Sequence, residues 1–171
     1  MIRKVACRKI EMVRNLNGEI GILKRLNHPN VISMLDHWHE RDHVCLVLKR
    51  HTQDLFSLSN NFTGGMPAQH TIPILRSTAA GLNYIHSQGV YHRDLKPENI
   101  MITGKGLPED PFEVVIIDFG VSLTAEELDG SGMTRGLIGS KGFFAPEQLL
   151  SMVCVRAHAT YPARRSLLVL L

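Results

Sequence analysis

Two short motifs carry side chains that could transfer a phosphoryl group. Residues 92–99 read His-Arg-Asp-Leu-Lys-Pro-Glu-Asn, and Asp-Phe-Gly follows at 118–120 after an apolar run. Phosphoryl transfer from a nucleotide needs a carboxylate to receive the proton of the acceptor hydroxyl, a cation near the moving phosphate, and oxygen ligands for Mg²⁺. The side chains that can supply these groups are Asp94, Lys96, Asn99 and Asp118.

Each of these side chains suits one part of the reaction. Asp94 would act as the general base, a role that contributes ~10²- to 10⁴-fold in rate. Lys96 would offset charge on the γ-phosphate, while Asn99 and Asp118 offer the hard oxygen ligands that Mg²⁺ takes in small number. Asp94, Asp118 and the nucleotide phosphates would bring several negative charges into one cleft. Two unit negative charges about 4 Å apart repel by ~4 kcal/mol at an effective dielectric constant near 20, so this cleft needs a cation. We therefore expect nucleotide to bind as its Mg²⁺ complex.

The order and spacing of the two motifs resemble the catalytic and metal-binding loops of eukaryotic protein kinases. Lysine two places after Asp94 is typical of the serine/threonine type. The resemblance covers about residues 5–150. It implies an α+β, two-lobed kinase fold, ATP and Mg²⁺ as cofactors, and a protein substrate with a Ser or Thr acceptor.

The first part of the chain predicts a small sheet with one helix. Alternating residues at 5–10 favour a strand, and apolar residues at helical spacing favour a helix over 19–26 that ends at Asn-His-Pro-Asn, residues 27–30. Two further apolar runs, 31–35 and 44–48, predict strands on either side of a polar turn. This arrangement resembles the back half of a kinase small lobe.

The second part predicts a long helix and a hairpin. Apolar residues at spacings of three and four predict a helix over 67–88, with Gly89 directly after it, as is usual at a helix C-terminus. The runs 100–102 and 114–117 predict a hairpin that leads to Asp118. The apolar residues expected on the buried face of the helix are Ile72, Leu75, Ala79, Leu82 and Ile85.

The resemblance also implies an ATP site. The family's Val-Ala-x-Lys motif has Arg8 in the lysine position, where a planar guanidinium could hold Glu19 but fits the phosphates less well than an ammonium. Residues 49–51 would be the hinge whose backbone binds adenine, and Asp54 follows where the family often contacts the ribose. The positions assigned to the ATP site are Ala6, Arg8, Glu19, Lys49, His51, Asp54 and Met101.

Three further residues are assigned to regulation through the same resemblance. Arg93 would pair with a phosphorylated activation segment, which would run from Asp118 to Ala-Pro-Glu at 145–147, and Thr134 is the candidate phosphorylation site. Ser140 stands where the family has Thr and keeps a hydroxyl that can bond Asp94 and Lys96. An upstream activating kinase is thus an expected partner.

The resemblance divides the chain into three parts. Residues 1–48 are expected to form a partial small lobe, 49–150 a partial large lobe, and 151–171 a tail unlike kinase sequence. No Gly-rich loop precedes Val5, and neither Asp nor Trp follows Glu147, where the family has a buried anchor helix. We therefore expect a kinase fold that is incomplete at both ends.

Composition and charge exclude several other classes. Removing the three arginines at 156, 164 and 165 from the 19 basic residues leaves 16, which equals the 16 acidic residues, so the net charge of +3 gives no basic nucleic-acid face. The longest apolar run, 167–171, is far below the ~20 residues of a membrane span. Three scattered cysteines favour a reducing compartment over a disulfide framework. We expect a cytoplasmic or nuclear protein with no membrane or nucleic-acid partner.

Two functional hypotheses follow. The first is a serine/threonine protein kinase, which the intact Asp94, Asn99 and Asp118 favour. The second is a non-catalytic, kinase-like module that binds partner proteins, which Arg8 and the incomplete ends favour. The histidines at 37, 39 and 43 could suggest a metal, but on a strand, turn and strand we expect them to be surface polar residues.

Overall fold

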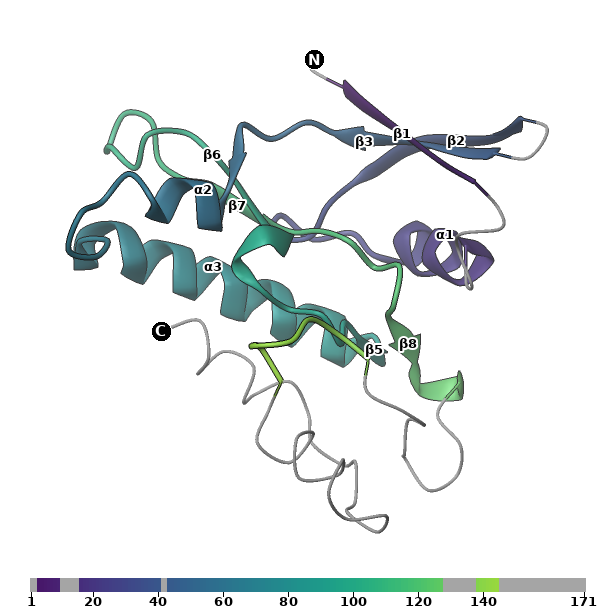
Figure 1. Ribbon diagram of the computed structural model, residues 1–171. Coiled ribbons are helices and arrows are strands. Elements are labelled where there is room, and N and C mark those ends of the chain that lie inside the picture. The colour runs from purple at the N-terminus through teal and green to yellow at the C-terminus, as the bar shows by residue number, and fades with distance from the viewer. Residues whose placement is uncertain (1–2, 10–15, 41–42, 128–137, 145–171) are drawn as a thin grey trace, which may run out of the picture.

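The computed structural model describes residues 3–9, 16–40, 43–127 and 138–144. One sheet and the helix α1 lie on one side of the molecule, and the long helix α3 lies on the other with the smaller sheets (Figure 1). Thr134, the Ala-Pro-Glu motif at 145–147 and the tail at 151–171 lie outside the described residues. Within the described residues, no helix is long and apolar enough to cross a membrane.

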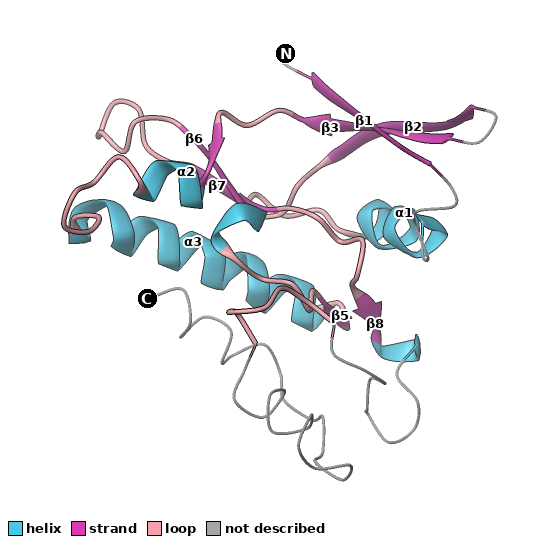
Figure 2. Cartoon of the chain, viewed as in Figure 1, coloured by secondary structure: helices cyan, strands magenta, loops and turns pink. Residues whose placement is uncertain are grey.

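The larger sheet is antiparallel, with strand order β1-β3-β2. Residues of β3 alternate between two faces: Val44 and Leu46 belong to the main hydrophobic core, whereas Cys45 and Val47 are buried on the opposite face. The helix α1 lies along one side of this sheet (Figure 2). The bounds are β1 (Arg3–Lys9), α1 (Leu16–Arg25), β2 (Met34–Glu40) and β3 (His43–Lys49).

One predicted strand is wrong in position. The expected strand at 31–35 is replaced by β2, which begins only at Met34. Val31 instead forms a parallel bridge to Ile116, and the Ile32 N–H donates to the Ile116 carbonyl at 2.9 Å. The apolar pair at 31 and 32 is therefore used to join the two halves of the molecule, a long-range contact that local pattern does not reveal.

The helix α3 (Ala68–Ser87) matches its predicted range, but its buried face differs. Ile72 was expected in the core and is 54% exposed. The buried residues are Ile74, Thr78, Gly81, Leu82 and Ile85. Gly81 lets this face approach the loop after α1, because an added Cβ there would lie 2.6 Å from the Asn30 carbonyl oxygen.

The remaining strands form two small sheets, β4-β6-β7 and β5-β8, and the second lies at the C-terminal end of α3 (Figure 1). Gly89 has φ +66, which confirms that it follows the helix in a left-handed conformation. The predicted hairpin is confirmed as β6 and β7, with Ile100 opposite Ile116. The bounds are β4 (Gln53–Asp54), α2 (Leu55–Ser59), β5 (Val90–Tyr91), η2 (Pro97–Asn99), β6 (Ile100–Thr103), β7 (Glu113–Ile116), β8 (Leu123–Thr124) and η3 (Ala125–Glu127).

The loop after α1 is fixed to the other half of the molecule by polar contacts. The Asn30 side chain donates to the Val114 carbonyl at 2.9 Å, and the Asn27 N–H donates to the Tyr84 hydroxyl at 2.9 Å. The His28 ring stacks on Tyr84 with ring centroids 4.8 Å apart. These contacts fix the C-terminal end of α1 relative to α3 and β7, and hence relative to the loops that follow them.

Candidate active site

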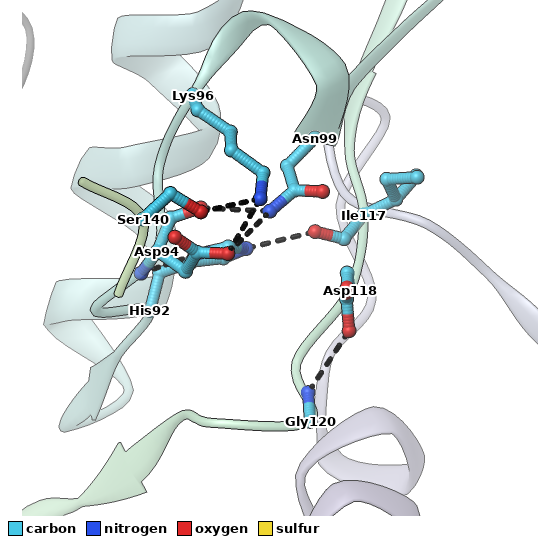
Figure 3. Close-up of polar contacts among 8 residues, drawn as sticks. All are labelled: His92, Asp94, Lys96, Asn99, Ile117, Asp118, Gly120 and Ser140. Carbon is cyan, nitrogen blue, oxygen red and sulfur yellow. Dashed lines mark hydrogen bonds and ion pairs between the residues drawn. The ribbon is translucent and has the colours of Figure 1, made fainter. Parts of the chain in front are cut away.

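The turn after β5 is built around a buried histidine. His92 is 1% exposed; its Nε2–H donates to the Ile117 carbonyl at 2.8 Å, and its Nδ1 accepts from the Asp94 N–H at 3.3 Å (Figure 3). Its ring meets Phe119 edge to face, with centroids 5.1 Å apart. Burial lowers the pKa of His92, so the ring stays neutral. One imidazole thus ties the 92–99 loop to the Asp-Phe-Gly motif.

Two residues of these loops have positive φ angles, which residues other than glycine rarely adopt. Arg93 has φ 67 and Asp118 has φ 65. Such angles cost free energy and persist only where surrounding contacts enforce them, which occurs often at functional sites. The contacts of His92 lie beside both turns, and the charges of Asp94 and Asp118 both act on its ring.

Asp94 belongs to a cluster of four polar side chains. Its Oδ2 contacts Lys96 Nζ at 3.1 Å and accepts from Asn99 Nδ2 at 3.2 Å, and Asn99 Nδ2 also donates to the Asp94 carbonyl at 2.8 Å (Figure 3). Lys96 donates to the Ser140 hydroxyl at 2.5 Å. The Asp94 Oδ1 is buried and has no hydrogen-bond partner among the described residues. Buried polar atoms are rarely left unpaired, so this oxygen is the atom available to a substrate proton.

The electrostatics of the site keep Asp94 ionised. Burial alone would raise the pKa of this carboxyl, but polar interactions with Ser140 and with Lys96 outweigh it, and the pKa lies below its ordinary value. A carboxylate that stays charged can accept a proton but does not hold one at neutral pH. This suits a base that acts as the acceptor oxygen attacks.

Gly139 determines where Ser140 lies. Its φ of +124 is in the region that favours glycine, and an added Cβ would lie 2.7 Å from the Arg93 carbonyl oxygen. The segment from 138 to 144 can therefore approach the Arg93 turn only because residue 139 lacks a side chain. This approach brings Ser140 within reach of Lys96.

Asn99 and Asp118 present oxygens of the type that Mg²⁺ binds. The Asn99 amide nitrogen is used by Asp94, so its Oδ1 points away from that carboxylate (Figure 3). Asp118 Oδ1 accepts from the Gly120 N–H at 3.3 Å. One amide and one carboxylate oxygen fit Mg²⁺, which keeps waters and phosphate oxygens as its other ligands. Elsewhere in the described residues, no group of three or more His, Cys, Asp or Glu could hold a metal, the histidines of β2 and β3 included.

The expected hinge follows β3. The Lys49 side chain is paired with Glu113, and His51 is buried with its Nδ1 3.1 Å from the Thr103 hydroxyl. Across the described part of the chain, the backbone groups of Arg50 and His51 make no hydrogen bond. Backbone donors and acceptors without partners are suited to a planar heterocycle such as adenine.

The other expected nucleotide residues are placed around this hinge. Asp54 accepts from Ser57 N–H at 2.7 Å and from the Ser57 hydroxyl at 2.8 Å, and so caps α2. Burial opposes ionisation of Asp54, but these bonds prevail and its pKa is lowered. Met101 lies in β6 opposite Asp54 and packs against the core.

The remaining expected residues are only partly described. Ala6 and Arg8 lie opposite Leu46 and Val44 in the register, which are core-facing positions, and their own side chains lie outside the described part. Glu19 is 3% exposed in α1. The expected pairing of Arg8 with Glu19 is therefore not tested by the described contacts.

Arg93, the expected partner of a phosphorylated segment, is half-buried. Its Nε donates to the Val121 carbonyl at 2.6 Å. Burial lowers the pKa of the guanidinium, and the charge of Glu127 acts in the opposite direction. An acidic side chain thus already acts on Arg93 from the segment after Asp-Phe-Gly.

Sequence reasoning missed two features, one in the site and one in the larger sheet. No role was assigned to the His92 side chain, although its place before two turns is where a buried polar tie is needed. Cys45 is disulfide-bonded, whereas the spacing of the three cysteines gave no indication of a disulfide. Strand pairing, which brings distant residues together, was the missing information.

Comparison with known proteins gives consistent matches. The protein kinase domain family model matches residues 1–161. Calcium/calmodulin-dependent protein kinase type 1 of Macrobrachium nipponense is 33% identical over 136 residues, covering 79% of this chain and 37% of that protein. A serine/threonine-protein kinase US3 homolog of Gallid herpesvirus 2 is 31% identical over 147 residues, covering 86% and 35%. Smooth muscle myosin light chain kinase of Gallus gallus is 33% identical over 134 residues, covering 78% and 7%. The chain spans about a third of the length of the first two relatives.

Proposed function

Because this chain belongs to the protein kinase family and has a partial form of its α+β fold, we propose that it transfers the γ-phosphate of ATP to a serine or threonine hydroxyl of a protein. The observation that carries the proposal is the arrangement at Asp94. One carboxylate oxygen is held by Lys96 and Asn99, and the other is unpaired. This geometry supports a base positioned next to a cation.

Each residue of the site has a distinct role in this proposal. Asp94 Oδ1 accepts the proton of the incoming hydroxyl, and Lys96 offsets charge on the transferred phosphoryl group. Asn99 Oδ1 and the Asp118 carboxylate hold Mg²⁺, which neutralises charge on the phosphate oxygens when bound. Ser140 orients Lys96 through its hydroxyl.

The nucleotide binds between the two halves of the molecule in this proposal. The unpaired backbone groups at Arg50 and His51 support adenine binding there. Ala6, Arg8 and Met101 would lie around the nucleotide, with Asp54 near the ribose. Glu19 would orient Arg8.

We assign regulation to the segment after Asp118. A phosphate on Thr134 would add nearly two negative charges and could compete with Glu127 for Arg93. The partners are then a protein substrate and an upstream activating kinase. The protein would act in the cytoplasm or the nucleus.

The second candidate is a kinase-like module that binds partners without catalysis. Arg8 favours it, since this arginine stands where the resemblance implies a lysine, and its register position lies opposite Val44. Such a module would bind nucleotide weakly or not at all and would transfer no phosphate.

The two candidates are separated by substitutions at the two carboxylates. Asp94→Asn should lower phosphate transfer by at least ~100-fold and leave Mg²⁺·ATP affinity within about threefold, because Asp94 is placed beside the acceptor. Asp118→Ala should lower both transfer and affinity, because it removes a metal ligand. Transfer is followed with radiolabelled ATP and a generic Ser/Thr substrate, and affinity by calorimetry with and without Mg²⁺.

Glu109→Gln is the matched control, because Glu109 is an exposed acidic residue on the loop between β6 and β7. It should change neither quantity. Absence of transfer by the unaltered chain would favour the binding module, and equal loss of nucleotide affinity in both variants would contradict the roles assigned to Asp94 and Asp118.

A further inference from the structure

Three side-chain positions form one row across the larger sheet. Cys7 of β1 and Trp38 of β2 both lie directly opposite Cys45 of β3. Residues directly opposite each other in antiparallel strands have Cα atoms about 4.5–5.5 Å apart, which falls within the span of about 4.4–6.8 Å that a disulfide bridges. Cys45 is disulfide-bonded, and the chain contains three cysteines.

From this register we infer that Cys7 is the partner of Cys45, and that the pair is a reversible redox modification site exchanging with low-molecular-weight thiols and disulfides of the glutathione class. Cys154, the remaining cysteine, belongs to the tail outside the described residues. The bond would join β1 to the central strand β3 and link residues 7 and 45, which are 38 positions apart in the sequence.

The exchange is balanced in atoms and electrons. One cysteine thiolate attacks the disulfide of oxidised glutathione, releasing one glutathione and leaving a mixed disulfide. The second cysteine thiolate attacks the protein sulfur of that mixed disulfide and releases the second glutathione. Two electrons pass from the cysteine sulfurs to glutathione, and the two thiol protons end on the two released glutathione thiols.

The sheet determines which cysteine is attacked first. Cys45 is 2% exposed on the central strand. β1 is an edge strand of the described sheet and pairs only with β3 there. Because Cys45 is buried, we assign the first exchange step to Cys7 of the edge strand and the second, resolving step to Cys45.

The bond would fix the position of Arg8. Cys7 and Cys45 lie on the face opposite the main core, while the next residue, Arg8, is opposite the core residue Val44. A slip of one residue in the pairing of β1 would exchange these two faces. Edge strands with few contacts slip or fray most readily, so a covalent link to β3 holds Arg8 on the core-facing side.

Trp38 supplies a built-in reporter of the redox state. It is the single tryptophan of the chain, is 39% exposed, and lies beside Cys45 in the row. Disulfides in contact with an indole quench its fluorescence more strongly than thiols do. Reduction should therefore raise the emission of Trp38.

The test uses the full chain equilibrated in glutathione buffers of graded redox ratio, followed by alkylation, intact mass measurement and peptide mapping. We expect a cross-linked peptide pair containing Cys7 and Cys45 in oxidising buffer and alkylation of both in reducing buffer, reversibly. Trp38 emission should rise along the same curve, and the thermal midpoint should fall by roughly 5 to 15 °C on reduction.

Two substitutions serve as controls. Cys7→Ser should abolish the redox dependence of both emission and midpoint, whereas Cys154→Ser should preserve it. Linkage of Cys45 to Cys154 or to a second chain would overturn the inference, as would free thiols at Cys7 and Cys45 throughout the glutathione series. The alkylation result needs no variant, so it stands even if Cys7→Ser folds poorly.

Discussion

Asp94 shows how one carboxylate becomes a base through its neighbours. Lys96 and Asn99 occupy one oxygen and leave the other unpaired, while Ser140 holds Lys96 from a separate segment. Ser140 could not reach Lys96 without Gly139, because the segment they share passes so near the Arg93 carbonyl. The geometry of the base therefore depends on a residue with no side chain.

Substitution of Gly139 tests this dependence. Gly139→Ala places a Cβ 2.7 Å from the Arg93 oxygen and should lower phosphate transfer by at least ~10-fold by displacing Ser140. Gly142→Ala is the matched control, since Gly142 also has a positive φ, +99, but a Cβ there meets nothing within 4 Å. Steady-state kinetics compare the two, and equal losses would mean that backbone strain alone is responsible.

Arg8 is the second position where we expect a single side chain to determine the rate of phosphate transfer. We expect Arg8→Lys to raise phosphate transfer several-fold, on the order of 1 kcal/mol of transition-state stabilisation, because a compact ammonium can contact both Glu19 and the phosphates. Lys24→Arg, on the exposed surface of α1, makes the reverse exchange away from the site and should have no effect. Unchanged or lower turnover for Arg8→Lys would show that the guanidinium is suited to this site.

At the scale of elements, packing faces are set by close approach between segments. Gly81 of α3 lies against Asn30 and Ile116, whereas Gly21 of α1 is exposed with nothing within 4 Å of an added Cβ. Both glycines are inside helices, where alanine is favoured by about 1 kcal/mol when no contact opposes it. Position in the packing, and not helix propensity, should therefore decide the outcome at Gly81.

These two glycines give a matched pair of substitutions. Gly21→Ala should raise the free energy of unfolding by ~0.5–1 kcal/mol. Gly81→Ala should lower it by ~1–3 kcal/mol, since its Cβ would lie 2.6 Å from backbone oxygen that cannot move freely. Urea unfolding measures both, and stabilisation by Gly81→Ala would contradict the close approach of α3 to the loop after α1.

The difference between local signals and contacts of distant segments explains which predictions from the sequence were correct. The hairpin β6–β7 and the range of α3 were predicted correctly, because apolar period and flanking turn residues are local signals. The site motifs were also local, so Asp94, Lys96 and Asn99 could be named from spacing. The strand at 31–35, the exposure of Ile72 and the disulfide of Cys45 depend on which distant segments meet. No local pattern contains that information.

At the scale of the whole molecule, buried histidines connect stability to pH. His51 is 7% exposed; its Nδ1 contacts the Thr103 hydroxyl, while no hydrogen bond reaches its Nε2 within the described residues. Burial lowers the pKa of His51, with Glu113 acting against this and Lys49 acting with it. Burial lowers the pKa of His92 as well. Both rings are therefore neutral in the folded chain at pH values where an exposed histidine is protonated.

We predict that the free energy of unfolding falls as the pH decreases below about 6.5, because the unfolded chain takes up protons at these histidines before the folded chain does. The loss continues until the pH reaches the lowered pKa values of the folded chain. Asp54 and Asp94, whose pKa values are also lowered, act in a separate window, since the stability they contribute is lost only below about pH 4.

Urea unfolding at about pH 7.5 and about pH 5.5 measures this dependence. His51→Gln should reduce the difference between the two pH values without abolishing it, because glutamine does not titrate whereas His92, with its lowered pKa, is still present. His39→Gln, at an exposed position of β2, should leave the difference unchanged. An identical pH difference in His51→Gln and in the unaltered chain would show that the hinge histidine is protonated equally in the folded and unfolded states, and would contradict its burial as a neutral ring.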